Sequence, residues 1–424
     1  MAAPLECPKD LTVPGEGSTT SRAILSKALG RACRELPLVV RALGTGPLRD
    51  DAAAVERALL PLLRESPAAV ASLLRHPHLS TLVRTLRSSS GVEAAGVRPL
   101  GTELLALVAF DLAWRGALPS PVTLRRLPRR LVSRAARVAV DLPPGVSAAT
   151  FQNGKVSAEL TGSTEVLDLA AVEAGAGHPW VSRPYRDVRG DIVLALADNN
   201  PLSSVEAHPD KKTPNTVDLG GHPEEEWIAS LRGALALIEK YLPAMSADVD
   251  VVLQQIVPTG FDAEKHLSCS YQEDIGTIYL SLHPSPLTMA EAIIHEVSHN
   301  KLNALFDVDP IIENGRDELY TSPIRPDPRP IHGVLLAVHA FVPVACMYES
   351  MTARSPVPAG GAGGDAGPSA GDVDVRRIAE RYAAVVRTNR AGTGVLEAHA
   401  RPTRIGKGLL DELFAWGRHF RQAG

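Results

Sequence analysis

The sequence of 424 residues has few cysteines, no long apolar run and no clear excess of charge of either sign. Its 4 cysteines, Cys7, Cys33, Cys269 and Cys346, lie far apart and form no CxxC pair. This argues against a disulfide framework and against a zinc ribbon. Lys and Arg number 44 against 48 Asp and Glu. A general nucleic-acid-binding protein would carry a clear basic excess, so we expect no nucleic-acid partner.

Neither a signal peptide nor a membrane span is expected. The first residues include acidic side chains and contain no apolar core segment. The longest apolar stretch, 334–347, is too short for a membrane span and contains a histidine and a proline. We therefore expect a soluble, cytoplasmic protein with no membrane partner, long enough to form two or three domains.

Changes in residue pattern divide the chain into five parts. These are a loose tail at 1–20, a helical N-terminal domain at 21–130, a strand-containing domain with the motif described below at 131–354, a Gly-, Pro- and Ala-rich linker at 355–372, and C-terminal helices at 373–424. Helical spacing of leucines precedes short β-branched segments, which Gly, Pro and Asn separate. The pattern predicts a mainly helical α+β protein with a small mixed sheet.

One segment, 125–137, contains six arginines. Such a segment forms either a patch for an acidic peptide or nucleic acid, or a solvated surface that balances acidic residues elsewhere. Because no aromatic residues are interleaved for base stacking, we favour the solvated surface.

A predicted helix from Thr288 to about Phe306 carries the motif with the clearest chemistry. Thr288 and Glu291 match a T-x-x-E capping box, which predicts where the helix begins. Within it, His295-Glu296-Val297-Ser298-His299 forms an HExxH motif. Histidines four residues apart project from one helix face and can chelate a single metal ion, and the glutamate lies beside them. We therefore expect a metal site here.

A catalytic site of this kind needs a third ligand. The metzincin pattern would place Gly at 302 and His at 305, where this chain has Leu302 and Leu305, so that class is excluded. The remaining candidates are Glu313, Glu318, Glu349, His332 and His339. His339 lies in an apolar helical stretch, where a buried imidazole needs a polar or metal partner. We favour His339, while the acidic residues stay open as alternatives.

A proline-rich segment, 320–330, precedes that stretch and carries Arg325 and Arg329. Its prolines restrict the backbone to an extended form and hold the two arginines at a defined spacing. An arginine near a metal is suited to binding a carboxylate with both of its nitrogens. The alternative is a structural ion pair of Arg325 or Arg329 with Asp327 or Asp317.

Several blocks of this sequence resemble a known family. ALADNNPL, EAHPDK, AIIHEVSHNKLNAL and YTSPIRPDPRPIHGVLLAVHAF, which occur in this order between Asp191 and Met351, resemble the HExxH-motif proteins found beside ribosomally made natural-product peptides. That family is understood as α-ketoglutarate-dependent peptide β-hydroxylases. The resemblance implies a zincin-like metal-binding core. The helices before it and the C-terminal residues show no matching block.

The resemblance also implies particular chemistry and partners. Fe(II) would be bound by His295, His299 and, by position, His339, with α-ketoglutarate and O2 as cosubstrates. The partner would be a precursor peptide, hydroxylated at a side-chain β-carbon, and Arg325 or Arg329 would bind the distal carboxylate of α-ketoglutarate. An all-imidazole site would depart from the usual set of two histidines and one carboxylate.

Glu296 leaves a second reading open. In a zinc metallopeptidase it would be the general base that deprotonates metal-bound water, and Zn would replace Fe(II). In an oxygenase it would instead orient a ligand, hold a peptide amide or hydrogen-bond a neighbouring group. A third reading is a binding or scaffold protein whose metal is structural. The sequence indicates no substrate-binding residues.

Overall fold

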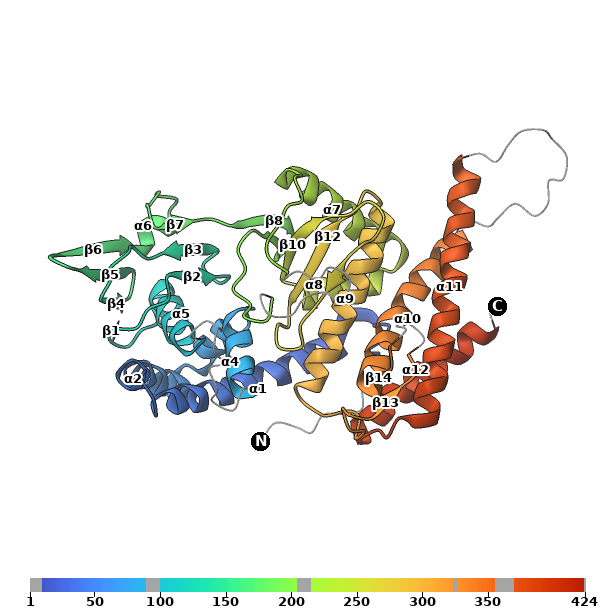
Figure 1. Cartoon of the computed structure of the whole chain (residues 1–424), viewed down its shortest axis with the longest axis horizontal. Helices are drawn as coiled ribbons and strands as arrows, with labels where there is room; N and C mark the ends of the chain where they lie inside the picture. The colour runs from blue at the N-terminus through green and yellow to red at the C-terminus, as the bar shows by residue number, and fades with distance from the viewer. Residues whose placement is uncertain (1–9, 89–99, 204–214, 323–326, 355–369, 423–424) are drawn as a thin grey trace.

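The protein is described here from a computed structural model, which covers residues 10–88, 100–203, 215–322, 327–354 and 370–422. Within these ranges the chain is an α+β protein, mainly helical with small sheets, as the sequence predicts (Figure 1). The EAHPDK block (206–211), Arg325 and most of the expected linker (355–369) lie outside the described residues.

The first part of the chain is helical. After a short 3-10 turn, η1 (Glu16–Ser18), the helices are α1 (Thr19–Leu43), α2 (Arg49–Glu65), α3 (Pro67–Leu74), α4 (Leu79–Ser88) and α5 (Leu100–Trp114). Helix α5 is buried along almost its whole length, as expected for a helix that is apolar on every side. It therefore forms the centre around which the other N-terminal helices pack.

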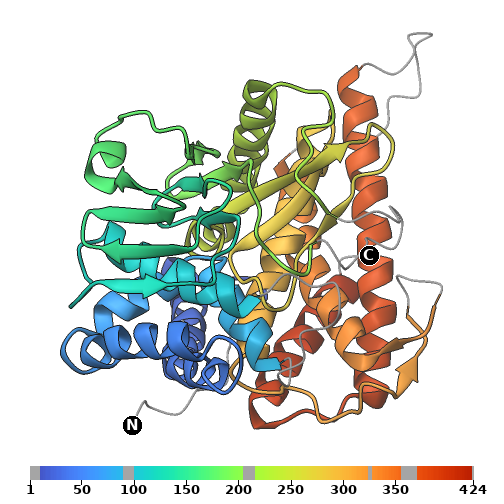
Figure 2. The ribbon, with the colours of Figure 1, turned by 60° about the vertical axis from the view of Figure 1, so that its left-hand side comes forward.

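Two small antiparallel sheets follow these helices. One has the order β1-β4-β5-β6 and the other β2-β3-β7. Their elements are β1 (Val122–Leu124), β2 (Arg130–Ser133), β3 (Val138–Asp141), β4 (Ala148–Gln152), β5 (Lys155–Leu160), β6 (Ser163–Asp168), helix α6 (Leu169–Glu173) and β7 (Val181–Ser182). Figure 2 shows these strands and the N-terminal helices on one side of the molecule and helix α11 on the other.

A mixed sheet of order β11-β12-β10-β9-β8 forms the centre of the second part. Its strands are β8 (Tyr185–Arg189), β9 (Ile192–Ala195), β10 (Gln255–Phe261), β11 (Ser268–Cys269) and β12 (Thr277–Leu282). Strands β9, β10 and β12 run parallel, while β8 and β11 pair antiparallel at the two edges. The three parallel strands are almost entirely buried, as parallel strands covered by helices usually are.

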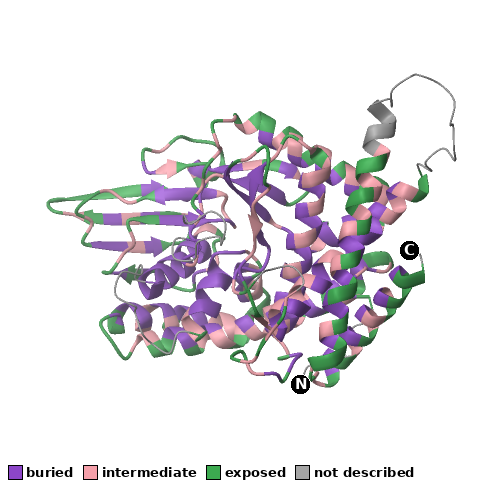
Figure 3. Ribbon diagram, turned by 45° about the vertical axis from the view of Figure 1, so that its right-hand side comes forward, coloured by how far each residue is buried: buried purple, intermediate pink, exposed green. Residues whose placement is uncertain are grey.

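Helices pack around this mixed sheet. They are α7 (Glu224–Tyr241), α8 (Pro243–Val252), α9 (Pro286–Phe306), α10 (Ile331–Arg354), α11 (Ala370–His399) and α12 (Arg404–Gln422), with the small ladder β13 (Leu319–Tyr320) and β14 (Arg329–Pro330) before α10. Helix α9, which holds the HExxH motif, packs against α7, α10 and strand β12. The helix of the motif therefore lies between the sheet and helices α7 and α10. Figure 3 shows that the strands of the sheet and the helix faces around them are largely buried.

The buried apolar side chains form two large cores. One extends from Ala32 to Trp180 and includes both helices and strands, so it is continuous across residue 130, where the sequence suggested a domain boundary. The other contains the mixed sheet and helices α7–α12. Helix α1 joins them, because Ile24 and Ala28 belong to the second core and Leu36 to the first.

Within the described part of the chain, one helix, α10, is long and apolar enough to cross a membrane. About 72% of that apolar window is buried inside the protein, as is typical of a core helix in a soluble protein. Its hydrophobicity is explained by packing against α9 and α11.

In the arginine-rich segment 125–137, four arginine side chains are exposed, namely Arg125, Arg126, Arg129 and Arg130, while the backbone and Arg134 are held by the protein. The backbone N–H groups of Arg125 and Arg126 donate to the carboxylate of Asp51. Arg134 is buried and donates to the backbone oxygens of Asp191 and Gln254. The exposed side chains agree with the solvated surface that the sequence favours, and the binding patch stays untested.

Candidate metal centre

The helix that carries the motif begins earlier than the sequence indicated. The side-chain oxygen of Ser285 accepts from the N–H of Thr288 (3.4 Å), and Pro286 occupies the first turn, so Ser285 is the N-cap. The predicted T-x-x-E capping box is therefore wrong. Glu291 instead accepts hydrogen bonds from Tyr348 and Arg381, which lie on α10 and α11. Glu291 thus ties three helices together one turn before the motif.

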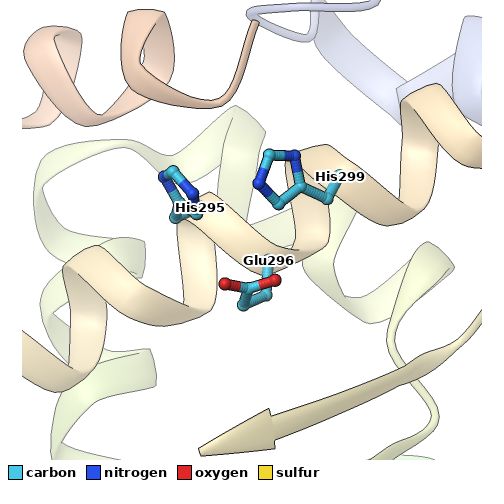
Figure 4. A group of neighbouring side chains, drawn as sticks. All are labelled: His295, Glu296 and His299. Carbon is cyan, nitrogen blue, oxygen red and sulfur yellow. The ribbon is translucent and has the colours of Figure 1, made fainter. Parts of the chain in front are cut away.

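The motif residues lie together as the spacing predicts. His295, Glu296 and His299 each offer a ligand atom, and these atoms lie within 4.8 Å of one another. The imidazole rings of His295 and His299 have their centroids 4.5 Å apart. Figure 4 shows both rings on the same side of α9, with the Glu296 carboxylate below them toward a strand. Two imidazoles in this arrangement can bind one metal ion.

The carboxylate of Glu296 is buried and fully engaged. The hydroxyl of Ser268 donates to its Oε1 (2.7 Å), and the hydroxyl of Ser270 donates to its Oε2 (2.8 Å). Both serines come from strand β11 and the residue just after it, on the sheet edge that faces α9. Because side chains alternate along an extended strand, the two hydroxyls emerge on the same face, one on each side of Cys269. The orientation of Glu296 is thereby fixed.

The side chain of His339 is fully buried on α10, and neither of its ring nitrogens has a hydrogen-bond partner. Burial lowers its pKa well below the usual value, and the charges of Lys301 and His299 lower it further. The ring of His339 is thus neutral at pH 7, and it lies near Lys301 and His299. His339 is not among the residues whose ligand atoms lie within 4.8 Å of one another. Its role as third ligand stays a prediction.

The other candidates for the third ligand are occupied elsewhere or exposed. Glu318 accepts from Arg401 and Tyr320, and these hydrogen bonds lower its pKa to about 2. Glu349 accepts from His419 and from Tyr382. Glu313 is exposed, and the ring of His332 packs near Phe306. In the described part of the chain, none of these four residues joins the HExxH group.

Arg329 forms the structural ion pair that the sequence left open as an alternative. Its Nε and Nη2 each lie 3.0 Å from Oδ2 of Asp327, and its side chain is partly exposed on the ladder before α10. Arg329 does not line the cavity beside His295 described below. Arg325, the second expected carboxylate-binding residue, lies outside the described residues.

A cavity of about 720 Å³ opens beside His295. It lies between α9, α10 and α11, and His266, Ser268, Phe341, Arg377 and Arg381 line it together with His295. The ring of Phe341 packs against that of His295, with centroids 4.6 Å apart. The volume of the cavity falls in the range of about 300–1,000 Å³ that is usual for small-molecule sites. One imidazole of the candidate metal site thus lines a space large enough for a small-molecule ligand.

These residues fit a bound metal ion. The buried Nδ1 of His299 and both nitrogens of His339 lack hydrogen-bond partners, which is costly unless a ligand supplies the missing interaction. Burial lowers the pKa of His299 and so keeps its ring in the neutral form that binds metals. The sequence indicates the imidazoles of the motif. It does not indicate Ser268 and Ser270, or the cavity residues Arg377, Ile378 and Arg381 on α11. The S-C-S alternation at 268–270 was the available signal for the serines.

Comparisons of the chain with protein-family models and with curated proteins found no match. The family resemblance and the function that it implies are therefore proposals.

Proposed function

We propose that this protein is an Fe(II)- and α-ketoglutarate-dependent oxygenase that hydroxylates a side-chain β-carbon in a ribosomally made precursor peptide. The proposal includes a zincin-like arrangement of helix α9 against the mixed sheet and a cytoplasmic location. His295 and His299, with His339 as the third residue, would bind the metal. It is supported by paired imidazoles on α9 beside a cavity of about 720 Å³.

The engagement of Glu296 is the observation that favours an oxygenase over a hydrolase. Hydrogen bonds donated to a carboxylate favour its charged form, so they weaken it as a general base for metal-bound water. Here both carboxylate oxygens accept from serine hydroxyls, Oε1 from Ser268 and Oε2 from Ser270. A carboxylate held in this way is suited to fixing the helix face and orienting neighbouring groups. Glu296 is therefore proposed as a positioning residue.

When bound, the metal and its cosubstrate would supply the oxidising chemistry, and the protein contributes binding and exclusion of water. His295 presents its ring to the cavity, while Phe341 packs against that ring and limits its orientation. His339, which is fully buried, shields the site from solvent on the side of α10. Arg325 and Arg329 stay the proposed residues for the distal carboxylate of α-ketoglutarate, with Arg329 required to exchange Asp327 for the ligand.

The first test needs no peptide substrate. The protein is loaded anaerobically with Fe(II), α-ketoglutarate is added, and the visible charge-transfer absorption of the chelated cosubstrate is recorded. A band in the wild type that disappears in His295→Ala is the expected result. The partly exposed His222, which lies outside the site, provides the matched control His222→Ala, and this variant should keep the band. Absence of a band in the wild type would contradict the oxygenase.

A zinc metallopeptidase is the second candidate, and one observation favours it. A carboxylate oxygen of Glu296 lies within 4.8 Å of the ligand atoms of both His295 and His299, which is near enough to act through one water molecule. Glu296→Gln separates the two functions. A peptidase should lose essentially all peptide cleavage in zinc, whereas an oxygenase should keep metal binding and the charge-transfer band, because glutamine retains one acceptor oxygen.

A further inference from the structure

The cavity beside His295 has a charged rim that the metal site does not use. Arg377 and Arg381, one turn apart on α11, both line it. Arg381 is neutralised by Glu291, which also accepts from the hydroxyl of Tyr348 (2.8 Å). Among the described residues, Arg377 has no carboxylate partner. Arg377 therefore places an exposed positive charge at the rim, which no carboxylate of the described residues neutralises.

His266, a residue of the cavity wall, has a buried ring nitrogen, Nε2, without a hydrogen-bond partner. Burial and the neighbouring charge of His283 lower the pKa of His266 to about 4, so the ring is neutral at pH 7. A neutral imidazole nitrogen either donates or accepts one hydrogen bond. Such an orphaned atom is costly unless a ligand pairs with it.

Most of the remaining lining is apolar. These side chains are Leu237, Leu287, Ala292, Phe341, Met351 and Ile378. α-Ketoglutarate, a five-carbon diacid, would fill only a small part of this cavity of about 720 Å³. Apolar walls with a few separated polar groups instead match a chain that offers side chains and backbone amides together.

We propose that this cavity binds a short peptide segment with an acidic side chain, whose carboxylate pairs with Arg377 while a backbone amide hydrogen-bonds to His266 and an apolar side chain packs near Phe341. This rests on the proposed function for the class of substrate, and it adds a sequence preference and two binding residues. The acidic side chain would lie at the rim, where α11 passes the start of α9. The apolar side chain would lie nearest to His295.

The test is peptide selection on the full chain, without iron or α-ketoglutarate. A phage-displayed random heptapeptide library is panned on the immobilised protein, and one enriched peptide is labelled for fluorescence anisotropy. We expect enriched peptides to carry Asp or Glu beside an aliphatic or aromatic residue. Arg377→Ala should weaken binding about three- to tenfold, and replacing the peptide acid by its amide should do the same.

Combining Arg377→Ala with the amide form of the peptide tests whether the peptide carboxylate contacts Arg377. If the peptide acid contacts Arg377, the amide peptide should bind wild type and Arg377→Ala equally well. Arg376→Ala is the matched control, because Arg376 pairs with Glu380 on the exposed side of α11 and does not line the cavity. His266→Ala should weaken the enriched peptide without changing the thermal midpoint beyond that of the control.

Three results would overturn the proposal: no enrichment, enriched peptides without an acidic residue, or equal losses with Arg376→Ala and Arg377→Ala. Peptide binding here requires no metal, so it is independent of the charge-transfer test. If an acidic peptide is enriched but no charge-transfer band appears, peptide binding in the cavity is supported and the oxygenase proposal is contradicted. A band without peptide selection would do the opposite.

Discussion

Two buried polar regions of this protein differ in how completely their atoms are paired. The aspartate cluster consists of Thr81, Asp198, Asn200, Asp274 and Tyr279. In it, Thr81 donates to Oδ1 of Asp274 (2.7 Å), while Asn200 and Tyr279 donate to Oδ2 (each 3.3 Å). The imidazole cluster, His266, His295, His299 and His339, keeps buried nitrogens without partners on three of its rings.

The difference separates structure from function. Satisfied polar groups in a core add specificity and stability, whereas unsatisfied ones cost free energy unless a ligand completes them. The aspartate cluster joins α4 to the mixed sheet through Thr81 and Tyr279 and needs nothing further. The imidazole cluster lies beside a cavity. Perturbing the first should therefore change folding, and perturbing the second should change binding.

The largest expected effect is on metal binding. His295→Ala should weaken metal affinity at least about a hundredfold, because even residues that only support a ligand commonly cost 10–100-fold. The unfolding free energy of the metal-free protein should change by less than about 1 kcal/mol, since the ring is only half-buried. Metal titration by calorimetry and urea unfolding measure the two quantities. Unchanged metal affinity in His295→Ala would contradict the assignment of the imidazole cluster to binding.

Asp274→Ala should have the opposite profile. It removes the acceptor of the Thr81 hydroxyl and one of the two acceptors of Asn200 and Tyr279, and it leaves a small cavity, so the free energy of unfolding should fall by about 2–4 kcal/mol. Urea unfolding measures this, and metal affinity should stay within twofold of wild type. A large loss of metal affinity at unchanged stability would show that the cluster serves the site instead.

The two clusters should also respond to pH with opposite signs. Burial lowers the folded-state pKa of His266 to about 4, so below about pH 6.5 the unfolded chain binds more protons and the protein loses stability. The loss from this residue is about 2 kcal/mol by pH 5. Burial and the charge of Asp198 raise the pKa of Asp274, whose contribution therefore declines as pH rises above about 4.

Unfolding of metal-free protein between pH 7 and pH 5 checks these signs. His266→Ala should flatten the loss of stability on acidification, and Asp274→Ala should not flatten it. His222→Ala serves as the control for removing a partly exposed histidine. An equal slope in wild type and His266→Ala would mean that the pKa of His266 is the same in the folded and unfolded protein, which would contradict the effect of burial.

The smallest expected effect is at the proline-rich segment. Arg329→Ala breaks a partly exposed ion pair with Asp327, so the unfolding free energy should change by less than about 1 kcal/mol. The same variant tests the proposed role of Arg329, because weaker use of α-ketoglutarate is expected there. If affinity for α-ketoglutarate is unchanged in both Arg325→Ala and Arg329→Ala, the carboxylate-binding assignment is wrong.

Local patterns predicted much of the secondary structure. Segments such as FQNGKVSAEL and GTIYLSLHP became β4–β5 and β12, and the C-terminal residues became α11 and α12. The beginning of α9 was missed because Ser285 and Thr288 both have cap-forming side chains. Ser285 is the N-cap because Pro286 occupies the first turn of the helix. Glu291 does not cap the helix, because it accepts hydrogen bonds from Arg381 and Tyr348 on two other helices.

The sequence by itself determined the paired imidazoles, because residues four apart on a helix share a face whatever surrounds them. It also determined the α+β class, through periodicity. Only the tertiary structure decided that Ser268 and Ser270 hold Glu296, that Arg329 pairs with Asp327, and that α11 brings Arg377 to the cavity beside His295. Those contacts join segments far apart in the chain or choose between competing partners, and local periodicity carries no information about either.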